Sequence, residues 1–263
     1  MKKQFLAVTV ALLVLLSMTA IATPPPQQAK TGLAGDPGRS RYDQQIQQAV
    51  SQKIQQTRQL QNVSASVEDG IVTLTGTVGL YQDKLDAAKK VKKIGNVSGV
   101  RNQIVVAGEN VPDTQLQQKL AKKVAYDRVG YFDNTFNYIA VNVGNGVVTL
   151  SGDAYWGVPV DDAIAMAART PGVKDVVNDV KVLPTSQFDD SLRIRTARVI
   201  YRDSVLSRYA IDPARPIRIV VENGHVTLYG TVQSAMDKNI AGIRAGSVAG
   251  AFSVDNKLVV DKG

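Results

Sequence analysis

Cysteine is absent from the 263-residue chain, and histidine occurs once, as His225. The lack of cysteine excludes disulfides, thiolate metal ligands and a lipid attached to a cysteine at a cleaved N-terminus. The sequence also has no Ser–His–Asp arrangement, no glycine-rich phosphate loop and no cluster of metal ligands. It therefore predicts no catalytic residues, no metal, no cofactor and no enzymatic activity.

Long apolar runs are missing after residue 22. The one such run, residues 5–16, follows Lys2 and Lys3 and precedes the small residues Ala20-Ile21-Ala22. This order is typical of a cleaved secretory signal peptide, and the run is shorter than the ~20 residues of a membrane span. A membrane anchor is the alternative interpretation. We expect a signal peptide over 1–22, a periplasmic location, and membrane contact that is peripheral rather than integral.

Acidic residues are outnumbered, with 23 Asp and Glu against 31 Lys and Arg. Without Lys2 and Lys3, 29 basic residues remain and the net charge is +6. In an exported protein this charge favours anionic lipid headgroups, rather than nucleic acid, as the partner. The alternative is that the charge only keeps the protein soluble. Residues 23–40 are rich in proline and glycine, and we expect them to form a disordered leader.

Three copies of a ten-residue stretch organise the rest of the chain. They are DGIVTLTGTV at 69–78, NGVVTLSGDA at 145–154 and NGHVTLYGTV at 223–232. Asp-Gly or Asn-Gly before alternating apolar residues predicts a hairpin with a type I′ turn, because both turn residues need positive φ. The predicted strand pairs are Val67–Val72, Ala65–Leu74 and Val63–Gly76, then Val143–Val148, Val141–Leu150 and Ile139–Gly152, then Val221–Val226, Ile219–Leu228 and Ile217–Gly230.

The spacing after each hairpin also repeats. Asn102, Asn178 and Asn256 each stand 26 residues beyond the last hairpin glycine, within Val-x-Asn-x-aliphatic-x-Val. Residues 69–106, 145–182 and 223–260 thus align without a gap, which indicates internal duplication. Helical periodicity precedes and follows each hairpin. We predict an α+β chain of three tandem αββαβ domains, each a mixed three-stranded sheet with two helices on one face.

Capping and glycine positions predict further detail. Candidate N-caps of the first helices are Asp113 or Thr114 and Asp189 or Asp190. The second helices are expected to end at residues that tolerate a left-handed conformation: Asn96, Gly172 and Gly250. Three glycines are expected on the helix-covered face, where a missing side chain lets a helix backbone come close: Gly76, Gly152 and Gly230.

The repeated Asx-Gly-x-Val-Thr-Leu-x-Gly core and the Val-x-Asn-x-aliphatic-x-Val strand resemble the BON domain family, named for bacterial OsmY and nodulation proteins. The resemblance covers 41–107, 113–183 and 188–260, which we call the first, second and third modules. It implies an αββαβ fold and an exported, transport-associated protein of the cell envelope that supports envelope integrity or the osmotic stress response. It also implies binding to phospholipid in some members and to periplasmic proteins in others.

Basic helices and aromatic residues provide candidate contacts. The second module holds seven of the 15 aromatic residues, and a basic amphipathic helix suits an anionic surface. The candidate lipid-binding residues are Lys119, Lys122, Lys123, Arg128, Tyr155 and Trp156. A second candidate face in the third module comprises Arg195, Arg198 and Arg202, near Arg193. The alternatives are a solvated outer face for the basic residues and a core position for Trp156.

The sequence thus favours a non-enzymatic BON protein that binds anionic phospholipid surfaces. The runner-up is a soluble periplasmic chaperone-like or adaptor protein that binds other exported proteins. An exposed apolar patch would favour this runner-up. His225 is expected on the outward face of its strand, without a catalytic role.

Overall fold

The computed structural model describes residues 37–127, 134–212 and 215–261. The expected signal peptide, most of the expected leader and Arg128 lie outside these ranges. Helix α1 (Pro37–Gln55) begins inside the range expected for the leader, four residues before position 41. Within the described part of the chain, no helix is long and apolar enough to cross a bilayer.

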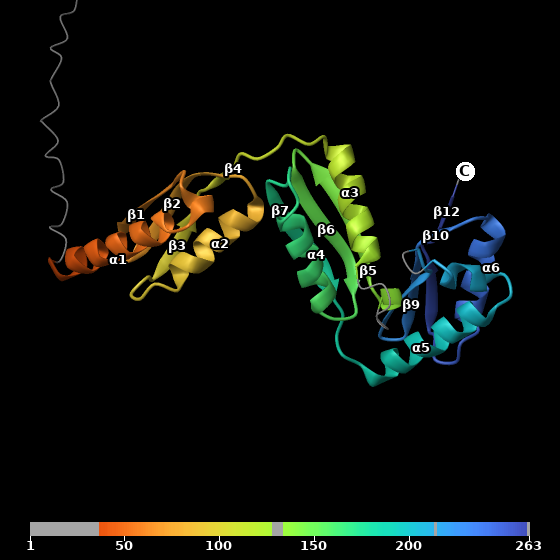
Figure 1. Ribbon diagram of the computed structural model, residues 1–263. Helices are drawn as coiled ribbons and strands as arrows, with labels where there is room; N and C mark the ends of the chain where they lie inside the picture. The colour runs from red at the N-terminus through yellow and green to blue at the C-terminus, as the bar shows by residue number, and fades with distance from the viewer. Residues whose placement is uncertain (1–36, 128–133, 213–214, 262–263) are drawn as a thin grey trace, which may run out of the picture. The chain divides into compact units, whose positions relative to one another are not determined.

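The second module has the clearest sheet. Strands β5 (Tyr138–Gly144), β6 (Val147–Ala154) and β7 (Asp175–Val182) pair in the order β5-β6-β7. β5 runs antiparallel to β6, whereas β7 runs parallel to it. Helices α3 (Asp113–Tyr126) and α4 (Val158–Ala168) pack against this sheet (Figure 1). The mixed three-stranded αββαβ fold is confirmed.

The first and third modules repeat this topology with a divided last strand. The first contains β1 (Val63–Glu68), β2 (Ile71–Val78), α2 (Tyr81–Lys92), β3 (Gly99–Asn102) and β4 (Val105–Val106). The third contains α5 (Gln187–Arg202), β8 (Arg218–Glu222), β9 (His225–Tyr229), β10 (Thr231–Val232), α6 (Ala235–Gly246), β11 (Ser253–Asn256) and β12 (Val259–Val260). Short 3₁₀ turns η1 (Arg58–Leu60), η2 (Asn134–Phe136) and η3 (Leu206–Ala210) lie between the first helix and the hairpin.

The repeated asparagine explains the division of the last strand. The Asn102 side-chain amide donates to the Lys84 carbonyl at 2.7 Å, and its Oδ1 accepts from the Ile104 N–H at 3.3 Å. Asn256 makes the same pair of bonds to Lys238 and Leu258. The side chain therefore takes over backbone bonds at the break and ties the strand to the second helix. Asn178 is exposed, and among the described residues its side chain bonds the Val180 N–H alone, at 3.1 Å, while β7 continues unbroken.

The hairpin turns have the predicted geometry. Asp69, Asn145 and Asn223 have φ of 52°, 55° and 50°, and each following glycine is also positive. All predicted strand pairs of the first two modules occur in the observed register. In the third module Val221–Val226 and Ile219–Leu228 occur, while Ile217 and Gly230 fall outside the β8–β9 ladder. Asn96, Gly172 and Gly250 adopt positive φ, as predicted. The second helices end four residues earlier than predicted, at Lys92, Ala168 and Gly246.

Both helices of each module pack on the same sheet face. In the second module, buried Leu116 and Leu120 of α3 and Ala163 and Ala167 of α4 meet the inward side chains of the hairpin, such as Leu150. The other two modules have equivalent cores. Aliphatic residues are buried at every second position of the strands and at every third or fourth position of the helices. This pattern of burial accounts for the fold.

The sequence analysis predicted that a helix backbone lies close to the last glycine of each hairpin, and this prediction was wrong. A Cβ added to Gly152 would lie 2.2 Å from the Tyr138 carbonyl oxygen, and one on Gly76 would lie 2.1 Å from the Asn62 oxygen. The close neighbour is therefore the backbone at the start of the adjacent strand, not a helix. Gly76, Gly152 and Gly230 also have φ of 110°, 121° and 128°, a region that glycine occupies at little cost.

The expected helix caps were also wrong. Pro112 is the N-cap of α3 and offers no side-chain acceptor. Ser186 is the N-cap of α5, and its hydroxyl accepts from the Asp189 N–H at 3.2 Å. Asp113 and Asp189 instead accept hydrogen bonds from the hairpin turns. They tie the helix to the sheet rather than terminate the helix.

Candidate binding surfaces

The lysines of α3 lie on its outer face. Leu116 and Leu120 are buried on the opposite side of the helix, whereas Lys119, Lys122 and Lys123 are exposed. Lys123 Nζ donates to Thr170 Oγ1 at 3.0 Å, so this lysine also bridges the two helices of the module. The surface formed by Lys119, Lys122 and Lys123 is called the α3 lysine face.

Tyr155 and Trp156 have different environments although they are adjacent in the sequence. Trp156 is exposed to 46%, so it does not complete the module's core. Tyr155 instead packs against the hydrophobic core of the third module, edge-on to Phe136 with 6.4 Å between ring centroids. The Arg193 guanidinium lies 4.7 Å from the centre of the Tyr155 ring. Of the two rings, Trp156 is the more exposed.

Further aromatic residues of the second module face the third. Phe136 is 4% exposed and belongs to the third module's core. Tyr138 stacks on Tyr229, with ring centroids 3.9 Å apart and planes within 5°. The Tyr229 hydroxyl donates to Asp153 at 3.0 Å, and burial raises its pKa. Three of the five described aromatic residues of the second module, Phe136, Tyr138 and Tyr155, therefore contact the third module.

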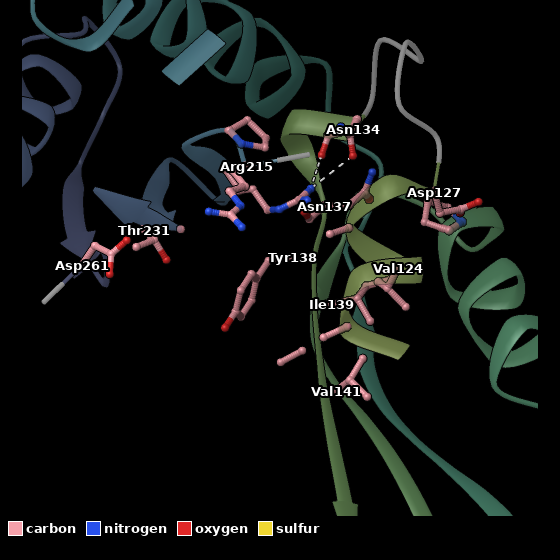
Figure 2. Close-up of a pocket in the computed structure, with 17 residues that line it drawn as sticks. Val124, Asp127, Asn134, Asn137, Tyr138, Ile139, Val141, Arg215, Thr231 and Asp261 are labelled. Carbon is pink, nitrogen blue, oxygen red and sulfur yellow. Dashed lines mark hydrogen bonds between the residues drawn. The ribbon is translucent and has the colours of Figure 1, made fainter. Parts of the chain in front are cut away.

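Arg218 makes polar contacts at the junction between the second and third modules. Its Nη1 donates to the backbone oxygens of Asn134 and Asn137 at 2.7 and 3.0 Å, and to Asn134 Oδ1 at 3.3 Å. Burial lowers the pKa of Arg218. Beside it, a cavity of about 540 Å³ is lined by Tyr138, Arg215 and other residues labelled in Figure 2. The guanidinium is occupied by backbone acceptors, so the arrangement positions the modules and offers no acid–base pair.

The arginines of α5 divide into buried and exposed groups. Arg193 is 1% exposed and donates to Asp190 and to the Val221 carbonyl, so it is a structural residue. Arg195 is half-buried and donates to the Ala249 carbonyl at 3.2 Å. Arg198 and Arg202 are exposed and form no ion pair within 37–127, 134–212 and 215–261. Two of the three residues of the second candidate face are thus open to a ligand.

His225 lies on the outward face of β9, as predicted. Its Nδ1 is 2.7 Å from Ser253 Oγ, and its ring meets Phe252 edge-on at 6.2 Å. Among the described residues, no group of three or more histidine and acidic side chains could hold a metal ion. The contacts of His225 are those of a strand surface.

Three copies of a small αββαβ unit, with exposed basic residues on their helices, define a tandem-repeat protein. Residues 42–108, 112–184 and 201–262 match the family described as BON domain. The chain belongs to the BON domain family. BON domains are non-catalytic binding domains, and membership is consistent with an envelope-associated, non-enzymatic protein.

Comparison with solved structures finds distant similarities. Two are described as structures of CdsD, a structural protein of the type III secretion system of Chlamydia trachomatis. They are 17% and 16% identical to this chain, cover 81% of it and 90% and 95% of their own chains, and give a TM-score of 0.23. A similarity at this level carries no argument about function. Comparison with curated proteins finds no match.

Proposed function

We propose that the protein is exported to the periplasm and binds anionic phospholipid surfaces reversibly, in support of envelope integrity or the osmotic stress response. The observation that carries the proposal is the α3 lysine face. Its three cations project from one side of a helix whose other side is anchored in the core by Leu116 and Leu120. Such a face can meet a flat anionic surface without any change in the fold.

The size of the effect follows from simple electrostatics. Each lysine near an anionic membrane contributes about 1 kcal/mol, so three give roughly 3 kcal/mol, which corresponds to weak and reversible binding. The interaction falls off within about 10 Å at 0.1 M salt. Binding should therefore need anionic lipid and should weaken steeply as the salt concentration rises.

The test is co-sedimentation of the purified protein with vesicles. One set contains phosphatidylglycerol mixed with phosphatidylcholine, and the other contains phosphatidylcholine alone. We expect binding to the anionic set at low salt. The variant Lys119→Glu, Lys122→Glu, Lys123→Glu should lose this binding. Because Lys123→Glu also removes the bond to Thr170, circular dichroism checks that the fold is retained. The variant Lys119→Glu, Lys122→Glu leaves that bond in place and should also lose most of the binding.

A matched control carries the same charge change elsewhere. Lys89, Lys92 and Lys93, at the end of α2 in the first module, are also exposed. Their joint replacement by glutamate should reduce binding less than the α3 variant does. Equal losses would mean that net charge, rather than the α3 lysine face, governs binding. If the parent fails to bind anionic vesicles, the lipid proposal is wrong.

A specific observation favours the second candidate, an adaptor that binds other exported proteins. Phe188 and Phe252 are 46% and 71% exposed and stack with 6.0 Å between ring centroids, beside the third hairpin turn. An exposed aromatic pair can hold an apolar segment of a partner protein. Binding of an unfolded protein that persists at high salt and is lost on Phe252→Ser would favour this function.

A further inference from the structure

The outer face of α6 carries an apolar stripe. Met236 and Ile243 are 69% and 71% exposed, and half-buried Ile240 lies between them. Their spacing of four and three residues places them on one side of the helix. The opposite side is fixed in the core by Ala241 and Ala245. The stripe is thus a surface that the fold of the third module leaves uncovered within the described part of the chain.

The other modules show that the fold does not require this stripe. In the gap-free repeat alignment, Met236, Ile240 and Ile243 correspond to Gln82, Asp86 and Lys89 of the first module. The corresponding residues of the second module are Val158, Asp162 and Ala165. The same helix therefore forms with polar residues at all three positions. Apolar side chains exposed where an equivalent module has polar ones indicate a contact surface.

Cations lie on α6 and on the neighbouring helix α5. Helix α5 packs on the same sheet face, and its outer side presents Arg198 and Arg202. The two helices are neighbours, since Arg244 of α6 pairs with Asp203 just after α5, with Nε and Oδ2 2.7 Å apart. Lys238 adds a further cation on α6 and forms no ion pair in the described ranges.

The acidic residues of this helical layer are engaged in contacts within the module. Asp189 is 1% exposed and holds the hairpin turn, and Asp190 pairs with Arg193. Asp237 is 3% exposed and accepts from the Tyr209 hydroxyl. The outward surface therefore combines an apolar stripe with cations on α6 and α5. An anionic bilayer complements this pattern, because its headgroups attract the cations and its acyl boundary accepts the apolar side chains.

We propose that the Met236–Ile240–Ile243 stripe of α6 inserts into the acyl boundary of an anionic membrane, with Arg198 and Arg202 of α5 at the headgroup level. This inference rests on the proposed function and deepens it: the α3 lysine face supplies charge alone, and α6 supplies the apolar, salt-resistant part of binding. The third module then holds the protein at the bilayer at a salt concentration that screens the lysines.

The absence of cysteine from the chain makes a direct test possible. Ile243→Cys is labelled with an environment-sensitive fluorophore in the full protein. The matched control is Lys89→Cys, the equivalent position of α2. On addition of phosphatidylglycerol-containing vesicles, the label at 243 should shift to the blue and be quenched by lipids brominated in the acyl chain. The label at 89 should show neither change.

A second pair of variants tests the stripe without a label. Met236→Gln with Ile243→Lys installs the residues of the first module and adds positive charge, so any loss of binding cannot arise from weaker charge attraction. We expect a loss of binding of about tenfold or more at high salt, since tenfold already matches the withdrawal of about one fully buried apolar side chain from a lipid phase. The control replaces Val105 and Ile211 by glutamine. These are equally exposed, at 61% and 81%, and lie off α6.

The outcomes separate this inference from the function on which it rests. Vesicle binding with an unchanged label at 243 would overturn the insertion of α6 and leave lipid binding intact. An absence of vesicle binding would overturn both. A blue shift that depends on protein concentration without vesicles would assign the stripe to a second copy of the chain. A shift with an unfolded protein but not with vesicles would assign it to a protein partner. Either result would contradict the membrane assignment.

Discussion

Asp189 accepts hydrogen bonds from the backbone N–H groups of Asn223, at 2.9 Å, and Gly224, at 2.8 Å. The carboxylate sits in the first turn of α5 and binds both residues of the hairpin turn. Asp43 holds the turn of Asp69 in the same way, and Asp113 holds that of Asn145. Each module thus uses one carboxylate to fix its first helix to the far end of its hairpin.

Replacement of this carboxylate should destabilise the module. Asp189→Ala leaves two turn N–H groups without an acceptor in a site that is 1% exposed, and we expect a loss of about 2–4 kcal/mol. Chemical denaturation of the full protein measures it. Asp43→Ala is the control, because its turn is more exposed and water can replace the carboxylate, so its loss should be smaller. Equal losses would show that burial of the Asp189 site is not what makes the contact important.

Much of the fold could be predicted because its signals are local. The Asx-Gly pair fixes the turn, and the turn fixes the register of Val67 with Val72 and its counterparts. The role of the aspartates could not be predicted from a fixed spacing. Asp43, Asp113 and Asp189 precede their turn residues by 26, 32 and 34 positions, because the segment between helix and hairpin varies in length. A search for an acid in the first turn of each first helix would have found Asp113 and Asp189, but not Asp43, which lies six residues after the start of α1.

The candidate site was harder to predict, because its exposure depends on contacts between modules. Helical spacing correctly placed the α3 lysines outside. Arg193, which the sequence places near the second candidate face, is 1% exposed, and Tyr155 of the second module lies against its guanidinium. The aromatic residues of the second module suggested a membrane contact, whereas Phe136 and Tyr138 bind the third module. Helical periodicity predicts which face of a helix points away from the core of its own module. It does not predict which residues of another module cover that face.

Gly152→Val should destabilise the second module by roughly 1–3 kcal/mol or more. Its φ of 121° disfavours a β-branched side chain, and the added Cβ would lie 2.2 Å from the Tyr138 oxygen. A thermal scan measures the loss. Gly144→Ala is the control, because a Cβ there meets nothing within 4 Å. Were both variants as stable as the parent, the close approach at Gly152 would have to be relieved by a backbone shift.

High pH should destabilise the third module and its junction. Burial raises the pKa of Tyr201, Tyr209 and Tyr229 above the usual 10.0. A raised pKa means that the folded state binds a proton more tightly than the unfolded chain. This stabilisation is fully present below pH 10 and is lost as the pH rises above it. Denaturation at about pH 9 and pH 11 should show the loss.

Tyr201→Phe separates this effect from general alkaline unfolding. The variant lacks the phenol that donates to the Ile217 carbonyl at 2.6 Å, so it should be less stable at neutral pH. It should also lose less additional stability between neutral and alkaline pH than the parent. A parent stability that stays constant across this range would contradict the assignment of these phenols to protonated, buried positions.

Arg218→Ala tests whether the second and third modules unfold together. The substitution removes the hydrogen bonds that Arg218 donates to the backbone oxygens of Asn134 and Asn137, and we expect a loss of about 2–4 kcal/mol. The Tyr138–Tyr229 stack would remain but would lose its polar neighbour. Because the junction shares Phe136 with the third module's core, we expect the single transition of these two modules to separate into two in chemical denaturation.

Two further variants identify the cause. Arg215→Ala removes a cation that lines the same cavity but is exposed, with a 3.9 Å contact to Asp212, and should change stability by less than about 0.5 kcal/mol. Arg218→Lys keeps the charge but lacks the planar fork that reaches several acceptors at once, so it should restore only part of the loss. If lysine restores stability fully, charge alone joins the modules. If alanine leaves a single transition at the parental midpoint, the aromatic contacts of Phe136, Tyr138 and Tyr155 are sufficient to couple them.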